Sequence, residues 1–215
     1  MKQHNRFSPI LIILALSTFL SCTEEQKNAL SHNETSFCDD YKAVQFQGMT
    51  ICVSADYFMV DGIRTPLGYT AALALADSMD QWLPSTAMVD AIYQQEDIKL
   101  APIPMPPTAA MTTRAYFVEH NRLINQQLAD SGYVGNTVSG KLLAGHKKDL
   151  IAIARNSTRV GIYGWHLSDS RVIQPFSTVH RREYFDYSHG VRLIKKRALD
   201  SNGEVVELAF PFGGI

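Results

Sequence analysis

The chain has 215 residues, of which 46% are hydrophobic and 19% charged, with a formal net charge of -1. This length suits one domain of ordinary size, and a composition this rich in apolar residues excludes a wholly disordered chain. The near-neutral charge gives no reason to expect nucleic acid as a partner. The sequence therefore predicts one globular domain with a substantial core.

The first residues have the order of a secretory signal peptide, because two basic residues precede a short apolar run, Pro9–Leu20. The run is too short to span a bilayer, for which a helix needs about 20 residues. Phe19-Leu20-Ser21-Cys22 resembles the lipobox at which bacterial lipoproteins are cut and acylated on cysteine. We expect residues 1–21 to be a signal peptide, and the exported protein to be anchored in the bacterial cell envelope through lipid on Cys22. The alternative is a plain signal peptide cut near Ser21.

Residues 22–36 are mostly polar, as in a linker, so a single folded domain is expected over 37–215. Cys38 and Cys52, the remaining cysteines, are 14 positions apart. An exported protein favours a disulfide between them, and closing such a loop stabilises the fold by roughly 3 kcal/mol. Two buried free thiols are the alternative. No cysteine follows position 52, so the C-terminal half has no cysteine nucleophile.

The first part of the domain, about residues 37–132, is expected to be mainly helical. Helix starts are indicated by Thr65-Pro66 and by Pro84-Ser85-Thr86, and Gly132 indicates a helix end. The expected helices run from Thr65 to about Met79, from Pro84 through Tyr93, and from about Thr113 to Leu128. Short β-prone runs are Thr50–Val53 and Tyr57–Val60. The prolines in Ala101–Pro107 predict an extended connector.

The second part, about residues 141–215, changes to an alternating pattern rich in β-branched residues, which is typical of strands. The expected strands are Leu150–Ala154, Arg159–His166, Ile173–Val179, Gly190–Ala198 and Glu204–Phe210. Ser201-Asn202-Gly203 predicts a hairpin between the last two. The predicted fold class is α+β, with N-terminal helices packed against a mostly antiparallel C-terminal β-sheet.

Charge is unevenly distributed along the chain. Residues 141–198 hold 12 basic and four acidic residues, so this block has a formal charge of +8 and the remainder -9. The block predicts a basic face, for which an exported protein would find anionic glycan or peptidoglycan as a partner. Basic side chains that only protect strand edges are the alternative reading.

Four of the seven histidines fall in the same block, at strand ends or in flanking loops, where catalytic groups concentrate. Imidazoles beside carboxylates and tyrosines are suited to proton transfer, and arginines to binding carboxylates. The candidate catalytic residues are His146, Asp149, Tyr163, His166 and His189. The candidate substrate-binding residues are Lys147, Trp165, His180, Arg182, Tyr187 and Arg192. His146, His166 and His189 are also candidate ligands for a divalent metal such as zinc.

Three segments carry resemblances. Gly-His-Lys-Lys-Asp at 145–149, Tyr-Gly-Trp-His at 163–166 and Asp-Tyr-Ser-His-Gly-Val-Arg-Leu at 186–193 look like signature blocks of a family of uncharacterised exported bacterial proteins, a likeness that implies no activity. The segment 188–193 is also similar to the Ser-His-Gly-Cys-x-Arg-Leu segment of L,D-transpeptidases, which cross-link peptidoglycan through a cysteine thioester. His189, Gly190 and Arg192 match when one position is deleted, and His166 would take the place of the upstream histidine. The cysteine is absent.

Three functions follow from these patterns. The first is an envelope hydrolase that acts on peptidoglycan or a related anionic glycan through a His/Asp/Arg site, with or without metal. The second is a polysaccharide lyase, in which a His/Tyr pair performs β-elimination without a nucleophile. The third is a lipoprotein that binds such a glycan without catalysis.

Overall fold

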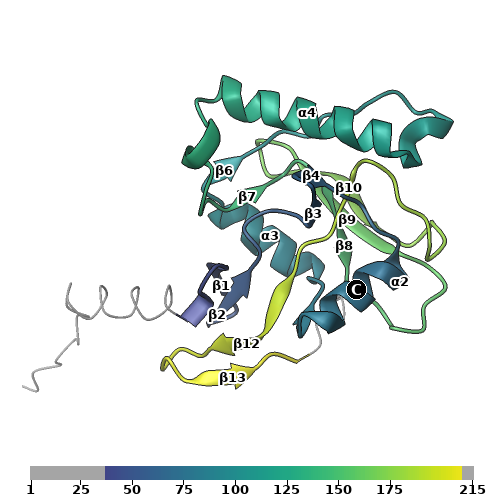
Figure 1. Cartoon of the computed structure of the whole chain (residues 1–215). Coiled ribbons are helices and arrows are strands. Elements are labelled where there is room, and N and C mark those ends of the chain that lie inside the picture. Colours follow the sequence, from purple (N-terminus) through teal and green to yellow (C-terminus); the bar gives the residue numbers. More distant parts are fainter. Residues whose placement is uncertain (1–36, 210–215) are drawn as a thin grey trace, which may run out of the picture.

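The structure, a computed structural model, describes residues 37–209 (Figure 1). The predicted signal peptide, the lipidated Cys22 and the linker lie outside the described residues. Helices and mostly antiparallel strands make up the described part, which confirms the α+β class. Within residues 37–209, no helix is long and apolar enough to cross a membrane.

A five-stranded sheet joins the two ends of the described chain. Its main path runs β1–β2–β12–β13, and β5 pairs with β12. The strands are β1 (Lys42–Phe46), β2 (Met49–Val53), β5 (Gln81–Trp82), β12 (Ile194–Leu199) and β13 (Val205–Glu207). Gln47 and Gly48 both have positive φ, as a two-residue hairpin loop requires. The β1–β2 hairpin, in the part expected to be mainly helical, thus pairs with the late strand β12, and the predicted hairpin β12–β13 is confirmed.

A four-stranded sheet has the order β10–β9–β8–β11, with β8 and β11 parallel. Its strands are β8 (Lys148–Ile151), β9 (Gly161–His166), β10 (Val172–Ser177) and β11 (His189–Gly190). Two short pairs complete the strands: β3 (Met59–Val60) with β4 (Ile63–Arg64), and β6 (Ile98–Lys99) with β7 (Leu143–Ala144). The strand predicted over Tyr57–Val60 shrinks to β3, because the Tyr57 amide donates to the neighbouring Asp56 carboxylate instead of a ladder partner.

Three α-helices lie between these strands: α2 (Tyr69–Ser78), α3 (Thr86–Gln95) and α4 (Arg114–Asp130), with short 3-10 turns η1 (Ala109–Thr112) and η2 (Gly135–Thr137). The side chains of Ser85 and Thr113 cap α3 and α4 by accepting a hydrogen bond from the backbone amide of the third residue of each helix, Met88 and Tyr116. The first predicted helix begins later than expected, at Tyr69, because the Thr65 hydroxyl donates to the Ile63 carbonyl and caps nothing.

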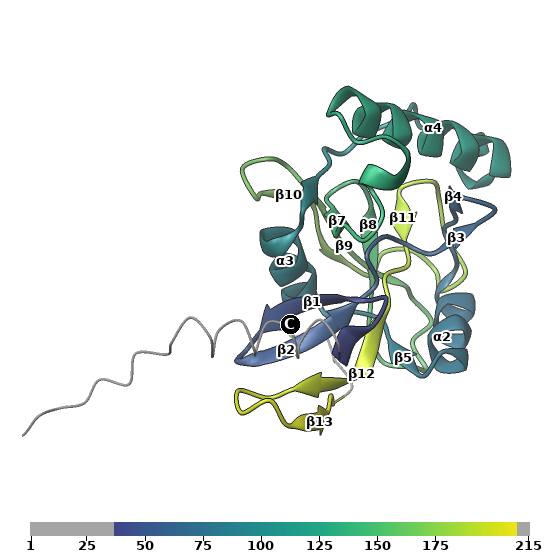
Figure 2. The same ribbon diagram turned by 60° about the vertical axis from the view of Figure 1, so that its left-hand side comes forward.

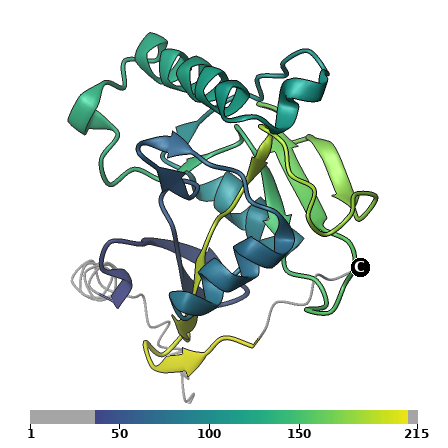
Figure 3. The same ribbon diagram turned by 45° about the vertical axis from the view of Figure 1, so that its right-hand side comes forward.

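The core consists of three clusters. One lies between α3 and the five-stranded sheet, the second joins α2 to β8 and β9, and the third fixes α4 through Ile124 and Leu128 against Leu100 and Leu143. Helix α4 runs across one end of the molecule, and the β12–β13 hairpin lies at the opposite end (Figures 1 and 3). The third cluster therefore holds α4 over the polar interior described below.

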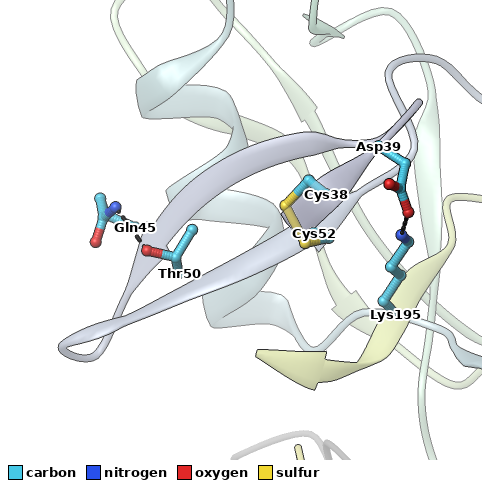
Figure 4. The surroundings of a disulfide bond; sticks show 6 residues. All are labelled: Cys38, Asp39, Gln45, Thr50, Cys52 and Lys195. Atoms are coloured by element: carbon cyan, nitrogen blue, oxygen red, sulfur yellow. Dashed lines mark hydrogen bonds and ion pairs between the residues drawn. A yellow bond between two sulfur atoms is a disulfide. The ribbon is translucent and has the colours of Figure 1, made fainter. Parts of the chain in front are cut away.

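Cys38 and Cys52 form a disulfide that ties the start of the described chain to β2, as predicted (Figure 4). Both cysteines are fully buried. An ion pair of 2.9 Å between Asp39 and the Lys195 ammonium on β12 lies beside it. The disulfide thus reinforces the sheet that joins early and late strands.

Candidate active site

Strand β8 places the three motif segments side by side. It lies between β9 and β11 (Figure 2). Lys148 is opposite Gly164 of β9 and His189 of β11, and Asp149 is opposite Tyr163 and Gly190. The backbones of the segments therefore meet in one sheet, although 43 positions separate His146 from His189. Their side chains, however, point into three different groups of partners.

The first group is a buried network below α4. The His146 Nε2 atom lies 3.3 Å from Asp56 Oδ1, and the Tyr57 hydroxyl donates to Asp149 Oδ2 at 2.8 Å. Burial lowers the pKa of His146 to about 4 despite the Asp56 carboxylate, and burial raises the pKa of Asp149. His146 and Asp149, two candidate catalytic residues, are thus enclosed by protein and turned toward internal partners.

Arg192 belongs to this network. It is 1% exposed, and its two terminal nitrogens donate to the carbonyls of Ser54 and Leu143, each at 2.7 Å. Its Nε atom lies 3.5 Å from Asp149 Oδ1, and its guanidinium stacks 4.3 Å from the centre of the Tyr57 ring. These contacts occupy the guanidinium inside the protein, so Arg192 has no free surface for a substrate carboxylate.

The polar groups of four other candidate binding residues also form hydrogen bonds within the protein. The Lys147 ammonium donates to the Tyr187 carbonyl, and burial lowers the pKa of Lys147 to about 7. The Tyr187 hydroxyl bonds to the backbone of Met105, and the indole of Trp165 donates to the His146 carbonyl at 3.2 Å. Arg182 binds three oxygen atoms of neighbouring residues. These side chains stabilise the fold around the motifs.

The second group surrounds Asp90 on α3. His166 Nε2 lies 3.0 Å from Asp90 Oδ1, to which the Tyr163 hydroxyl also donates at 2.9 Å. The His166 ring stacks on Tyr93, with 4.2 Å between ring centres. The candidate catalytic residues Tyr163 and His166 therefore share one carboxylate with each other, and this carboxylate is not Asp149.

The third group surrounds Asp186, and we call it the Asp186 cluster. Asp186 Oδ1 accepts hydrogen bonds from the Ser188 amide at 2.8 Å and from the Ser188 hydroxyl at 2.6 Å. Asp186 Oδ2 accepts from the Tyr184 hydroxyl at 3.0 Å and lies 4.0 Å from His189 Nε2. The His180 ring stacks on Tyr184, with 4.2 Å between ring centres. His180 and Tyr184 are partly exposed, whereas Asp186, Ser188 and His189 are buried beneath them.

The surroundings of the Asp186 cluster raise the pKa of Tyr184 and lower the pKa values of His189 and Asp186. Burial raises the pKa of Tyr184 to about 12, and the Asp186 charge raises it as well. Burial lowers the pKa of His189 to about 4, although Asp186 opposes the change. Burial alone would raise the pKa of Asp186, but His189 and the bonds from Ser188 and Tyr184 outweigh it and lower the pKa. At neutral pH the cluster thus combines an ionised carboxylate, a protonated tyrosine and a neutral buried imidazole.

Cations lie around the same cluster. Lys148, on β8 opposite His189, holds its ammonium 4.7 Å from the centre of the Trp165 ring, and burial lowers its pKa. Arg159 and Arg181 form a β-bridge next to His180, and both are exposed. Neither arginine forms an ion pair with a carboxylate within residues 37–209. One terminal nitrogen of Arg159 donates to the Val179 carbonyl at 2.7 Å, so Arg181 is the less engaged of the two arginines within this range.

The basic face expected from the charge count is smaller than predicted. Several of its members pair with carboxylates from elsewhere in the described chain: Lys141 with Asp97, Arg155 with Asp77, Lys195 with Asp39 and Lys196 with Asp80. The acidic first part of the chain therefore compensates much of the positive charge of the second part.

The predicted metal site is not formed by the three histidines. His146 turns to Asp56, His166 to Asp90 and His189 to Asp186, so their imidazoles have separate carboxylate partners. Among residues 37–209, no three His, Cys, Asp or Glu side chains are arranged to hold a metal ion. In a regular ladder the three histidines would share one face, because Lys148 lies opposite Gly164 and His189. Positive φ angles at Gly145, Gly164 and Trp165 break this alternation.

The sequence did not indicate Tyr184 as a site residue, because it lies between polar and aromatic neighbours and belongs to no recognisable motif. It also missed Asp56 and Arg64, whose carboxylate and guanidinium meet at 2.6 Å beside a cavity of about 380 Å³. No spacing rule links Asp56 to His146, because 90 positions separate them. Only the fold brings these residues together.

No protein-family model, curated protein or solved structure matches this chain. The function is therefore inferred from the chemistry of the site itself.

Proposed function

We propose that this chain acts on an anionic saccharide of the cell envelope by proton transfer at the Asp186 cluster, in a β-elimination. The observation that carries the proposal is the stacked pair of His180 and Tyr184, partly exposed above an ionised Asp186 and surrounded by cations. A His/Tyr pair supplies a base and an acid without a nucleophile.

Each group has a role in this reaction. Lys148 and Arg181 neutralise the carboxylate of a uronate, which acidifies the proton on the adjacent carbon. The His180 imidazole takes that proton, and the C–H electron pair forms a carbon–carbon double bond as the glycosidic C–O bond breaks. The Tyr184 hydroxyl gives its proton to the departing oxygen. Asp186 positions Tyr184, and the raised pKa of Tyr184 keeps its hydroxyl protonated until the leaving oxygen develops charge.

Hydrolysis, the first function expected from the sequence, receives weaker support from the same residues. Glycoside hydrolysis commonly uses two carboxyl groups, one of them protonated. Asp186 is ionised, and no other carboxylate of the described residues contacts His180, Tyr184 or His189. The cluster therefore fits elimination better.

The proposal is tested by incubating the exported protein with a panel of polyuronates and peptidoglycan fragments. Elimination creates a conjugated double bond, which ultraviolet absorbance detects. We expect Tyr184→Phe and His180→Ala each to reduce turnover by about 100-fold or more. The control is Tyr116→Phe, which removes the hydroxyl of another half-buried tyrosine, bonded to the Pro106 carbonyl.

The control variant should keep turnover within about threefold of the wild type, since Tyr116 lies outside the cluster. Melting temperatures measured in parallel identify any variant that merely unfolds. Absence of an unsaturated product from every substrate, or full turnover by folded Tyr184→Phe, would overturn the proposal.

A further inference from the structure

A cavity of about 380 Å³ lies beside the C-terminal half of α4, outside the Asp186 cluster. Its polar lining consists of Asp56, Arg64 and Asn125, and its walls are mostly apolar: Met59, Leu128, Ala129, Val134 and Val138, with Tyr133. Pockets of this size that combine apolar walls with a few polar groups are typical small-molecule sites. The volume is near the lower end of the usual range, which suits a single sugar unit.

The charges of the polar lining compensate each other. Arg64 binds the Asp56 carboxylate through Nε at 3.0 Å and through a terminal nitrogen at 2.6 Å. The other terminal nitrogen of Arg64 donates to Asn121 and to Asn125 Oδ1, at 3.0 and 3.1 Å. With its guanidinium engaged in this way, the lining favours an uncharged polar group over a free ion.

The polar groups of the cavity that Arg64 does not occupy provide one hydrogen-bond donor and one acceptor. Asn125 uses its oxygen toward Arg64, so its amide nitrogen, which has no acceptor among residues 37–209, keeps two N–H donors. Asp56 remains 16% exposed, and its Oδ2 atom has only Arg64 as a hydrogen-bond partner in the described chain. A secondary amide matches this pair, because its carbonyl accepts from Asn125 and its N–H donates to Asp56.

We infer that this cavity binds the acetamido group of an N-acetylated sugar. The acetamido methyl packs against the apolar wall formed by Leu128 and Val138, and the sugar ring lies toward Tyr133. The inference rests on the proposed function in one respect, which is that the ligand is a saccharide of the envelope. Helix α4 also connects this cavity to the chain segment that holds the Asp186 cluster, since Phe117 of α4 contacts Phe185, next to Asp186, with 6.2 Å between ring centres.

Calorimetric titration of the exported protein with N-acetylglucosamine, glucosamine and glucose tests the inference. N-acetylglucosamine should bind about tenfold or more tightly than the other two, because only it offers the amide. Asn125→Asp keeps the oxygen that Arg64 binds but loses the N–H donors and adds a negative charge. This variant should lose the preference for N-acetylglucosamine and gain affinity for the cationic glucosamine.

The control is Asn136→Asp, which makes the same change at an exposed position of η2 that does not line the cavity, and it should bind like the wild type. Equal binding of N-acetylglucosamine and glucose, no binding, or an unchanged preference in Asn125→Asp would overturn the inference. The proposed reaction is tested separately, because Tyr184→Phe should keep this binding and Asn125→Asp should keep turnover of a polyuronate without acetamido groups.

Discussion

Replacement of Arg192 by methionine tests the buried network below α4. Methionine keeps much of the apolar stem but removes the guanidinium. The variant leaves the carbonyls of Ser54 and Leu143 without their donors, and leaves the Asp149 carboxylate without its cation. The Tyr57 hydroxyl remains as the one hydrogen-bond donor that contacts this carboxylate within residues 37–209.

The expected loss of stability is large because every affected group is buried. Removing one partner of a buried ion pair costs about 3–5 kcal/mol, and each orphaned carbonyl costs about 1–3 kcal/mol. These terms overlap, since water can enter the space that the guanidinium leaves, so we expect a total of about 4 kcal/mol. For a domain of this size, that loss lowers the melting temperature by about 8–16 °C.

Urea unfolding followed by circular dichroism measures the effect, with Asp149→Asn and the double variant completing a mutant cycle. Asp149→Asn removes the charge that Arg192 neutralises, so the double variant should be more stable than the sum of the two losses predicts, by at least about 1 kcal/mol. If Arg192→Met does not fold, the double variant should still fold. A loss below about 1 kcal/mol, or strictly additive losses, would refute the network's energetic role.

Three further outcomes follow from the structure. The pKa values of His146 and His189 are about 4 in the folded protein and near 6.5 in the unfolded chain, so only the unfolded chain binds these protons between the two values. The free energy of unfolding should therefore be at its full value above about pH 6.5 and fall toward pH 4, by up to about 1.4 kcal/mol per pH unit for each histidine. A urea midpoint that does not change with pH would contradict this. Replacing Cys38 and Cys52 by serine should cost roughly 3 kcal/mol, and equal midpoints would show that the disulfide stabilises nothing. Gly145→Ala should cost at least about 2 kcal/mol in the same assay, since a Cβ atom at φ +97° would lie 2.3 Å from a backbone carbonyl; wild-type stability would exclude this close contact.

Local sequence signals predicted those parts of the fold that depend on local chemistry. Pro84-Ser85-Thr86 located the start of α3, because the Ser85 hydroxyl accepts from a backbone amide at the helix N-terminus. The third helix was expected from about Thr113, and the Thr113 hydroxyl caps it in the same way. The β1–β2 hairpin was not predicted, because its turn has no typical turn motif and Gln47 adopts a positive φ angle, which is rare for glutamine. Its pairing with β12 joins segments about 140 positions apart, which only tertiary packing decides.

The sequence predicted which chain segments would lie together, but it did not predict which partners their side chains would contact. Strand pairing does bring His146, His166 and His189 into neighbouring segments. Their directions depend on irregular geometry, such as the positive φ of Trp165 beside Gly164, which disturbs the alternation of faces expected for a strand. Tyr184 became visible only through its contact with Asp186 in the folded chain.

The mass of the reaction product tests the central proposal most directly. Mass spectrometry of a uronate oligosaccharide treated with the purified protein distinguishes elimination from hydrolysis, since hydrolysis adds one water across the cleaved bond and elimination adds none. The proposed roles of His180 and Tyr184 predict a product pair without added water, formed by the wild type and not by folded Tyr184→Phe. A product pair that has gained one water, or an intact substrate after incubation with the wild type, would contradict them.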